Sequence, residues 1–201
     1  MAKIKLTKNE LKKQKDSLKM YQRYLPTLML KKQQLQAEIR ITEQRLSDLQ
    51  SKKNTLDTSL QTWVAVFGEP KIFTPDILKI TSLKTGQGNI AGVAIPIFEG
   101  VEFALAPYDL ARTPLWLDAA VDKVKQLIML DLEAQVVEEQ RKRLDHELRI
   151  TTQRVNLFEK IKIPETRTNI KKIQVYLGDQ QTSAVVRGKI AKSGLEKAAS
   201  Q

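Results

Sequence analysis

The chain has 201 residues, a length that suits one or two domains. It contains no cysteine and one histidine, His146, which excludes disulfides, thiolate metal sites and histidine-rich metal clusters. Lys and Arg number 34 against 23 Asp and Glu, a net charge of +11, while glycine and aromatic residues are few. This composition is typical of a long charged helix rather than of a compact globule.

The first 65 residues predict a long N-terminal coiled-coil helix. A heptad register from Ile4 to Trp63 puts apolar residues at thirteen of its eighteen a and d positions, without a phase slip. Such a narrow, sustained stripe indicates a coiled coil rather than a globular surface helix. Pro26 removes one backbone donor, so a local kink is expected there.

Residues 66–115 differ in kind and predict a small globular insertion. The runs Ile77–Leu83 and Asn89–Phe98 resemble strands, and they flank a glycine-containing segment, Lys84–Gly88. We therefore expect a β-hairpin whose turn is that segment. Pro96 places its strand at a sheet edge.

Residues 116–177 predict a second coiled-coil helix, followed by an extension over 178–201. Ten of fourteen heptad positions between Trp116 and Lys162 are apolar, and after Pro164 the stripe resumes one residue out of phase. A proline at a phase change indicates a kink or a local adjustment of the supercoil. Beyond Gly178 we expect helix only in parts, with a frayed end.

The two apolar stripes predict an antiparallel helix pair, because each is the simplest cover for the other. If Trp63 and Trp116 lie side by side near the turn, residue x faces about residue 179 − x, and roughly 22 C-terminal residues project unpaired. The predicted fold is mainly α: a long antiparallel two-helix coiled coil with a β-hairpin insertion at its turn end. The seam residues singled out are Leu28, Leu35, Ile39, Leu46, Leu49, Leu56, Leu60, Leu127, Leu144, Leu148 and Val155.

The sequence presents no active site, and we assign no catalytic, cofactor-binding or metal-binding residue. His146 lies off the stripe between two acidic residues, as a solvated side chain does, and Gly86–Gly88 lacks the pattern of a phosphate-binding loop. The lysine-rich start, Lys3–Lys15, either forms a solvated helix face or binds an acidic partner, which would be a protein or a nucleic acid. Composition and periodicity leave these alternatives open.

Three ordered motifs resemble those of the D subunit of V-type rotary ATPases. The first is a Leu-Pro-Thr sequence followed by an apolar run and a lysine, the second resembles NxAGVxxP, and the third resembles RVNxxE followed by Ile-Pro. Together they span most of the chain. The residues that carry the resemblance are Leu25, Pro26, Thr27, Lys31, Asn89, Ala91, Gly92, Val93, Pro96, Arg154, Val155, Asn156 and Pro164.

The resemblance implies a non-catalytic rotor shaft. It would couple ATP synthesis or hydrolysis in a hexamer of A and B subunits to proton or sodium transport, with a small F subunit beside it. A funnel-like C/d subunit would connect it to the membrane ring. It also implies a peripheral position on the cytoplasmic side, no cofactor, no nucleic acid and no homo-oligomer. The C-terminal tail departs from the family pattern, and its candidate contacts with the hexamer sleeve are Arg187, Lys189 and Lys192. The alternative is a basic coiled-coil protein that binds nucleic acid.

Overall fold

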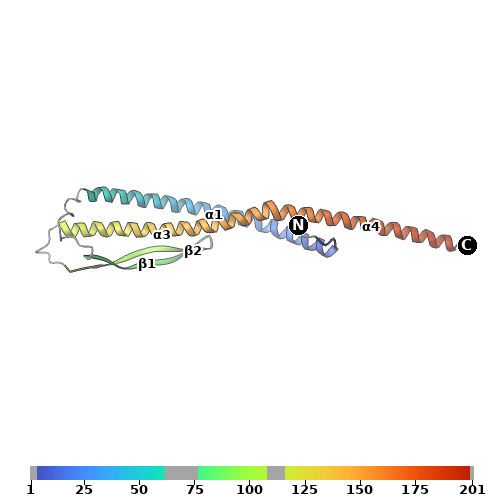
Figure 1. Ribbon diagram of the computed structural model, residues 1–201, viewed down its shortest axis with the longest axis horizontal. Coiled ribbons are helices and arrows are strands. Elements are labelled where there is room, and N and C mark those ends of the chain that lie inside the picture. The colour runs from blue at the N-terminus through green and yellow to red at the C-terminus, as the bar shows by residue number, and fades with distance from the viewer. Residues whose placement is uncertain (1–3, 62–76, 108–115, 200–201) are drawn as a thin grey trace. The chain divides into compact units, whose positions relative to one another are not determined.

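The structure, a computed structural model, describes residues 4–61, 77–107 and 116–199. It is mainly helical with one antiparallel β-hairpin, so the predicted fold class is confirmed (Figure 1). No helix in these ranges is long and apolar enough to cross a membrane. The elements are α1 (Lys8–Gln61), β1 (Leu78–Ile90), β2 (Val93–Leu105), α3 (Trp116–Asn156), a π-helical turn η1 (Leu157–Lys162) and α4 (Ile163–Ala199).

The chain divides into two compact units. The terminal unit comprises residues 1–30 and 151–201, and the hairpin unit comprises residues 31–150. The terminal unit therefore holds the start of α1, the end of α3, η1 and α4. The hairpin unit holds the rest of α1 and α3 together with both strands.

Helix α1 begins where the sequence provides a capping box. The Glu10 backbone N–H donates to Thr7 Oγ1 at 3.3 Å, which satisfies one of the free donors at a helix start. The helix then continues through Pro26 to Gln61. Thr27 Oγ1 donates to the Tyr24 carbonyl at 2.8 Å, one turn below. The missing donor at Pro26 therefore does not end the helix.

The hairpin turn is displaced from its predicted place. The prediction of a turn at Lys84–Gly88 is wrong, because β1 runs through this segment to Ile90 and β2 begins at Val93. Ala91 and Gly92 have φ values of 51° and 79°, as a two-residue hairpin turn requires. The strand glycines serve packing instead. A Cβ on Gly86 would collide with the Glu99 carboxylate, and a Cβ on Gly88 would lie 2.6 Å from Ile97 Cδ1.

The core of the hairpin unit joins both helices to the hairpin. Leu35 and Leu144 are completely buried, and they cluster with Ile39 of α1 and Ile95 of β2. Each buried side chain of this size contributes roughly 1.5–3 kcal/mol through removal of apolar surface from water. One apolar core of the unit therefore lies where α1, α3 and β2 meet.

In the terminal unit the predicted phase change takes the form of a π-helix. The Ile163 N–H donates to the Phe158 carbonyl, five residues back, and η1 accommodates the extra residue just before Pro164. After η1 the buried residues are Ile163, Thr166 and Ile173, all on the stripe predicted to resume after the proline. Thr166 and Thr151 place polar side chains in this seam, and the Thr166 hydroxyl donates to the Lys162 carbonyl of its own helix.

Antiparallel pairing follows the predicted relation within each unit. In the terminal unit the relation puts residue 158 opposite Tyr21, and the rings of Tyr21 and Phe158 lie 5.1 Å apart between centroids. In the hairpin unit Lys31 pairs with Glu147, one residue from the expected partner. Trp63, on which the relation was based, lies outside the described residues, and Trp116 begins α3 half-buried.

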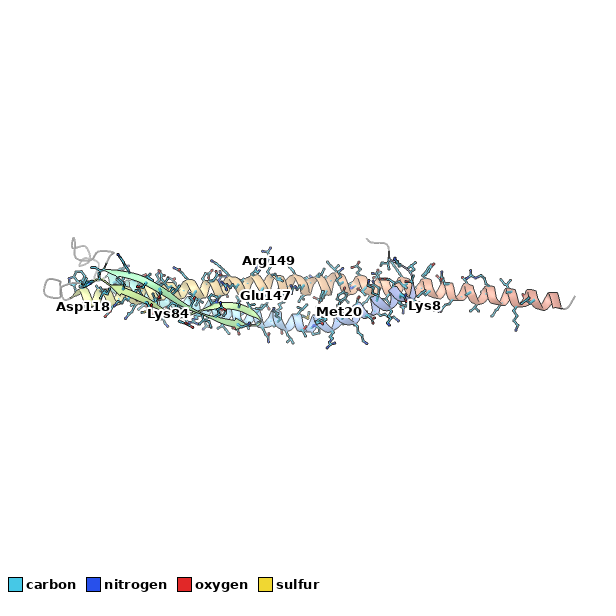
Figure 2. The ribbon with its side chains drawn as sticks, turned by 90° about the horizontal axis from the view of Figure 1, so that it is seen from below. Lys8, Met20, Lys84, Asp118, Glu147 and Arg149 are labelled. Atoms are coloured by element: carbon cyan, nitrogen blue, oxygen red, sulfur yellow. The ribbon has the colours of Figure 1, made fainter. Side chains whose placement is uncertain are left out.

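The C-terminal extension is more regular than its sequence predicted. Helix α4 runs without interruption to Ala199, so the expectation of helix only in parts is wrong. Gly178, Gly188 and Gly194 lie inside the helix, each at a cost of about 1 kcal/mol relative to alanine. Strong helix formers surround them, and the Thr182 hydroxyl donates to the Gly178 carbonyl. Figure 2 shows α4 continuing as a single helix past the level of Lys8.

Candidate functional site

The AGV motif forms the tip of the hairpin. Asn89 Oδ1 accepts the Gly92 N–H at 2.9 Å, which closes the turn, and Ala91 and Gly92 supply its left-handed backbone. Ile90, Ala91 and Val93 pack against the core of the hairpin unit. The motif therefore packs the tip of the hairpin against α1 and α3.

Two side chains of α3 fasten the hairpin beyond its tip. Gln140 is buried, and its Nε2 donates to the Pro96 carbonyl at 2.5 Å. Arg143 Nη1 donates to the Ala94 carbonyl at 3.4 Å. The heptad pattern did not identify Gln140, because that pattern is defined by apolar residues alone.

Cross-helix ion pairs set the register of α1 against α3 in the hairpin unit. Lys31 Nζ lies 2.6 Å from Glu147 Oε1, Arg45 Nη2 lies 2.7 Å from Glu133 Oε1, and Lys53 Nζ lies 2.6 Å from Asp131 Oδ1. In all three pairs the cation is on α1 and the anion on α3. Charged pairs beside an apolar seam select partner and orientation more than they add stability. Sequence inspection alone missed these pairs.

The ionisation of these groups follows from their partners. The hydrogen bond to Asp131 raises the pKa of Lys53, and the attraction of the same carboxylate adds to it. On α3 the Arg141 guanidinium, 2.7 Å from Glu138, lowers the pKa of that carboxyl mainly through their hydrogen bond. Both shifts stabilise the charged form and none of them prepares an acid or base for catalysis.

The other motif residues occupy the two helices. Lys31 is in the ion pair with Glu147, Val155 is buried, and Leu25 is half-buried. The exposed residues among them are Pro26, Thr27, Arg154, Asn156 and Pro164.

The predicted seam residues point into the helix pair to different degrees. Five are buried and the rest are half-buried. The buried set is Leu35, Ile39, Leu49, Leu144 and Val155; the half-buried set is Leu28, Leu46, Leu56, Leu60, Leu127 and Leu148.

The net charge of the chain belongs to one unit. The terminal unit holds 18 basic and 6 acidic residues, a net +12, and the hairpin unit holds 16 and 17, a net −1, which together give +11. The lysine-rich start of the sequence and the basic tail are thus parts of the same unit. The terminal unit is a cationic surface suited to an acidic partner.

The last part of α4 exposes both cations and apolar side chains. Every side chain described from Gly178 to Leu195 is exposed, including Arg187, Lys189 and Lys192. The large apolar side chains are among them: Val185 is 59% exposed, Ile190 65% and Leu195 72%. Large apolar side chains with this exposure are candidate contacts for a partner protein.

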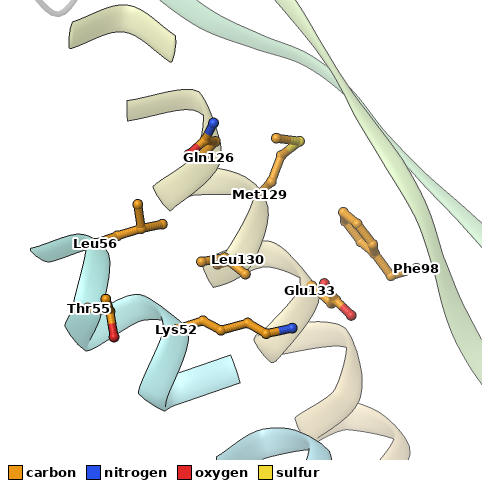
Figure 3. Close-up of a pocket in the computed structure, with 8 residues that line it drawn as sticks. All are labelled: Lys52, Thr55, Leu56, Phe98, Gln126, Met129, Leu130 and Glu133. Atoms are coloured by element: carbon orange, nitrogen blue, oxygen red, sulfur yellow. The ribbon is translucent and has the colours of Figure 1, made fainter. Parts of the chain in front are cut away.

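Neither of the features closest to a small-molecule site has catalytic chemistry. An open groove of about 540 Å³ in the hairpin unit is lined by four apolar and four polar or charged residues, with Phe98 of β2 facing Leu56, Met129 and Leu130 (Figure 3). His146 is exposed on α3. Within the described ranges no three His, Cys, Asp or Glu residues are grouped to hold a metal ion.

The fold and these surfaces define a class of protein: one unit pairs two antiparallel helices with a docked hairpin, and the other is a helical unit with a basic surface. Residues 10–193 match the family model of the ATP synthase D subunit. The chain is 51% identical to the V-type ATP synthase D subunit of Borreliella burgdorferi, over 98% of this chain and 97% of the relative. The proteins of the same name from Chlamydia pneumoniae and Chlamydia muridarum are 38% and 33% identical, each over 96% of this chain and over 93% and 96% of the relative. The chain belongs to the ATP synthase D-subunit family.

Proposed function

We propose that this chain is the central shaft of a V-type rotary ATP synthase or ATPase, and that it couples ATP turnover to ion transport by rotating. Family membership over nearly the whole chain is the observation that carries the proposal. The helix pairing supports it, because an apolar seam with cross-helix ion pairs, as in the hairpin unit, resists twisting. The names of the relatives give no support to the nucleic-acid alternative.

The shaft transmits work and performs no chemistry. ATP is turned over by the A and B subunits, and ions cross the membrane ring, so no residue of this chain is assigned a catalytic role. The small F subunit and the funnel-like C/d subunit are its further proposed partners. The chain is a peripheral part of the complex, on the cytoplasmic side of the membrane.

The terminal unit is the part proposed to enter the sleeve of the A and B hexamer. Its net charge of +12 and the exposed apolar side chains of α4 suit an enclosing protein surface that carries acidic groups. Arg187, Lys189 and Lys192 are the proposed cationic contacts there.

A rotation assay tests the proposed function. The chain has no cysteine, so a Thr81→Cys substitution on the exposed part of β1 gives one labelling site for a bead. With the hexamer fixed to a surface, ATP should drive unidirectional rotation of the bead, and removal of ATP should stop it. A bead that stays fixed relative to an actively hydrolysing hexamer would refute the proposal.

A truncation tests the sleeve assignment separately. A chain that ends at Leu177 keeps every buried residue of α4 but loses the exposed extension. It should fold normally by circular dichroism and bind the hexamer at least tenfold more weakly. The control, Lys142→Gln/Arg149→Gln in the hairpin unit, removes two exposed cations and should leave this affinity within twofold. Equal binding by the truncated and full chains would contradict the assignment.

A further inference from the structure

The two outer edges of the hairpin are not equivalent. The turn at Ala91–Gly92 makes Ile90 and Val93 a hydrogen-bonded pair, so along β2 the backbone groups of alternate residues, Ala94 and Pro96, point away from β1. By the same alternation the backbone groups of Thr85, Gln87 and Asn89 point outward along β1.

The outer edge of β2 is closed. Gln140 and Arg143 of α3 donate to the outward carbonyls of Pro96 and Ala94. Pro96 also lacks an N–H, so it offers no donor to a further strand. This edge has the protections that proteins use against unwanted strand pairing.

Within the described ranges, the outer edge of β1 has none of these protections over Thr85–Ile90. Among the described residues the sheet consists of β1 and β2 alone, and no proline or charged residue lies in β1 from Thr85 to Ile90. The side chains of Thr85, Gln87 and Asn89 are exposed. Six consecutive neutral residues, three of which have outward backbone donors and acceptors, are a template for an added strand.

One face of this edge shows what such a strand must carry. Gly86 and Gly88 have no side chains, and Glu99 and Ile97 of β2 lean across them toward the edge. Ile97 is 43% exposed, and Glu99 forms no hydrogen bond or ion pair in the described part of the chain, although its charge helps to raise the pKa of Lys84. The nearby Lys84 is engaged by Glu102 at 2.5 Å. The uncovered side chains are thus one apolar group and one carboxylate.

We propose that the outer edge of β1 over Thr85–Ile90 binds an extended strand of another subunit of the rotary complex. The strand carries a basic residue beside Glu99 and, two residues away on the same face, an apolar residue beside Ile97. A second copy of this chain fits less well, because its β1 has no cation between Thr85 and Ile90 to place beside Glu99. The proposal rests on the proposed function, since it takes the occupant from the same complex.

Amide hydrogen exchange at single-residue resolution tests the proposal in the isolated chain and in the assembled complex. The outward N–H groups of Gln87 and Asn89 should exchange fast in the isolated chain and at least a hundredfold more slowly in the complex. The inward N–H groups of Gly88 and Ile90 should be slow in both, as the internal control. Fast exchange at Gln87 in an assembled, ATP-hydrolysing complex would overturn the inference and leave the proposed function standing. Protection in the isolated chain would overturn it too, with doubled mass identifying self-pairing. A chain that fails to assemble overturns both.

A matched pair of variants gives a second measurement. Gln87→Pro removes one outward donor without touching the inward ladder, whereas Gln87→Ala keeps that donor and removes the side chain. Affinity for the rest of the complex should fall at least tenfold for Gln87→Pro and stay within twofold for Gln87→Ala. Glu99→Gln should weaken binding severalfold and make it less sensitive to salt. Equal affinities for the two Gln87 variants would refute strand addition. If Gln87→Pro does not fold, the amide hydrogen exchange of the unaltered chain tests the proposal instead.

Discussion

Deleting Glu159 from the π-helical turn tests why the turn exists. Ile163 follows Val155 by eight residues, one more than a heptad, and η1 accommodates the excess. After the deletion the spacing is seven, so Ile163, Thr166 and Ile173 keep their place in the seam of an ordinary α-helix. Pro164 would then lie in an α-helical interior, where it blocks one hydrogen bond and clashes with the preceding turn at a cost of about 3 kcal/mol.

The deletion alone should therefore lower the free energy of unfolding, measured by urea denaturation, by about 3 kcal/mol. Combining it with Pro164→Ala should restore stability to at least that of the unaltered chain. Deletion of Glu139, an equally exposed residue of α3, is the control. It turns Leu144 and Val155 out of the seam and should cost more than about 3 kcal/mol, with no rescue by Pro164→Ala.

Two results would refute this reasoning. A Glu159 deletion as stable as the unaltered chain would mean that the π-helix does not accommodate Pro164. A double variant as unstable as the Glu139 deletion would mean that η1 does not correct the phase of the seam.

Three other predictions concern the hairpin unit and the helix surfaces. Leu144→Ala should lower the free energy of unfolding by about 3 kcal/mol in a urea titration, because it opens a cavity at the junction of α1, α3 and β2. The control Leu30→Ala changes a side chain that is 59% exposed and should cost under about 0.5 kcal/mol in the same titration. Gly92→Val should lower the free energy of unfolding by about 1–2 kcal/mol, because valine would have to adopt a φ of 79°. The melting temperature should fall for this variant and not for the control Gly178→Val, whose position is inside a helix. Arg141→Gln should destabilise by under about 1 kcal/mol at pH 7. The difference should vanish as the pH falls through the lowered pKa of Glu138, because protonation removes the pair in the unaltered chain as well; a loss that stays constant down to pH 2 would contradict this origin.

The sequence predicted the parts of the fold that depend on periodicity. The heptad positions identified Leu35, Leu144 and Ile173 as seam residues, and the position of the phase change was visible at Pro164. Periodicity does not say how a helix absorbs one extra residue, so the π-helix itself was not predicted. The predicted turn is in the wrong place because two closely spaced glycines, Gly86 and Gly88, are typical of a turn. In the structure they lie in a strand and make room for Ile97 and Glu99 of the neighbouring strand.

The candidate surfaces were less accessible to sequence reasoning. Arg187, Lys189 and Lys192 were identifiable as a basic tail, but the division of charge between the two units depends on which segments fold together. The role of Gln140 was not predicted, because its partner is the backbone carbonyl of Pro96, 44 residues away. Every residue has a backbone carbonyl, so the side-chain pattern does not identify such a partner. The free edge of β1 likewise follows from hydrogen-bond alternation once the true turn is known.

The threonines in the seam have a mechanical consequence. The hydroxyls of Thr42 and Thr166 bond to carbonyls of their own helices, so each offers the opposite helix only a methyl group. Such a contact has no preferred direction, so these threonines add no directional bond between the helices. The Gln140–Pro96 junction is directional and must break to yield. Under torque the register of α1 against α3 therefore depends on the ion pairs and the apolar packing around the threonines, whereas the position of the hairpin depends on a bond of fixed direction.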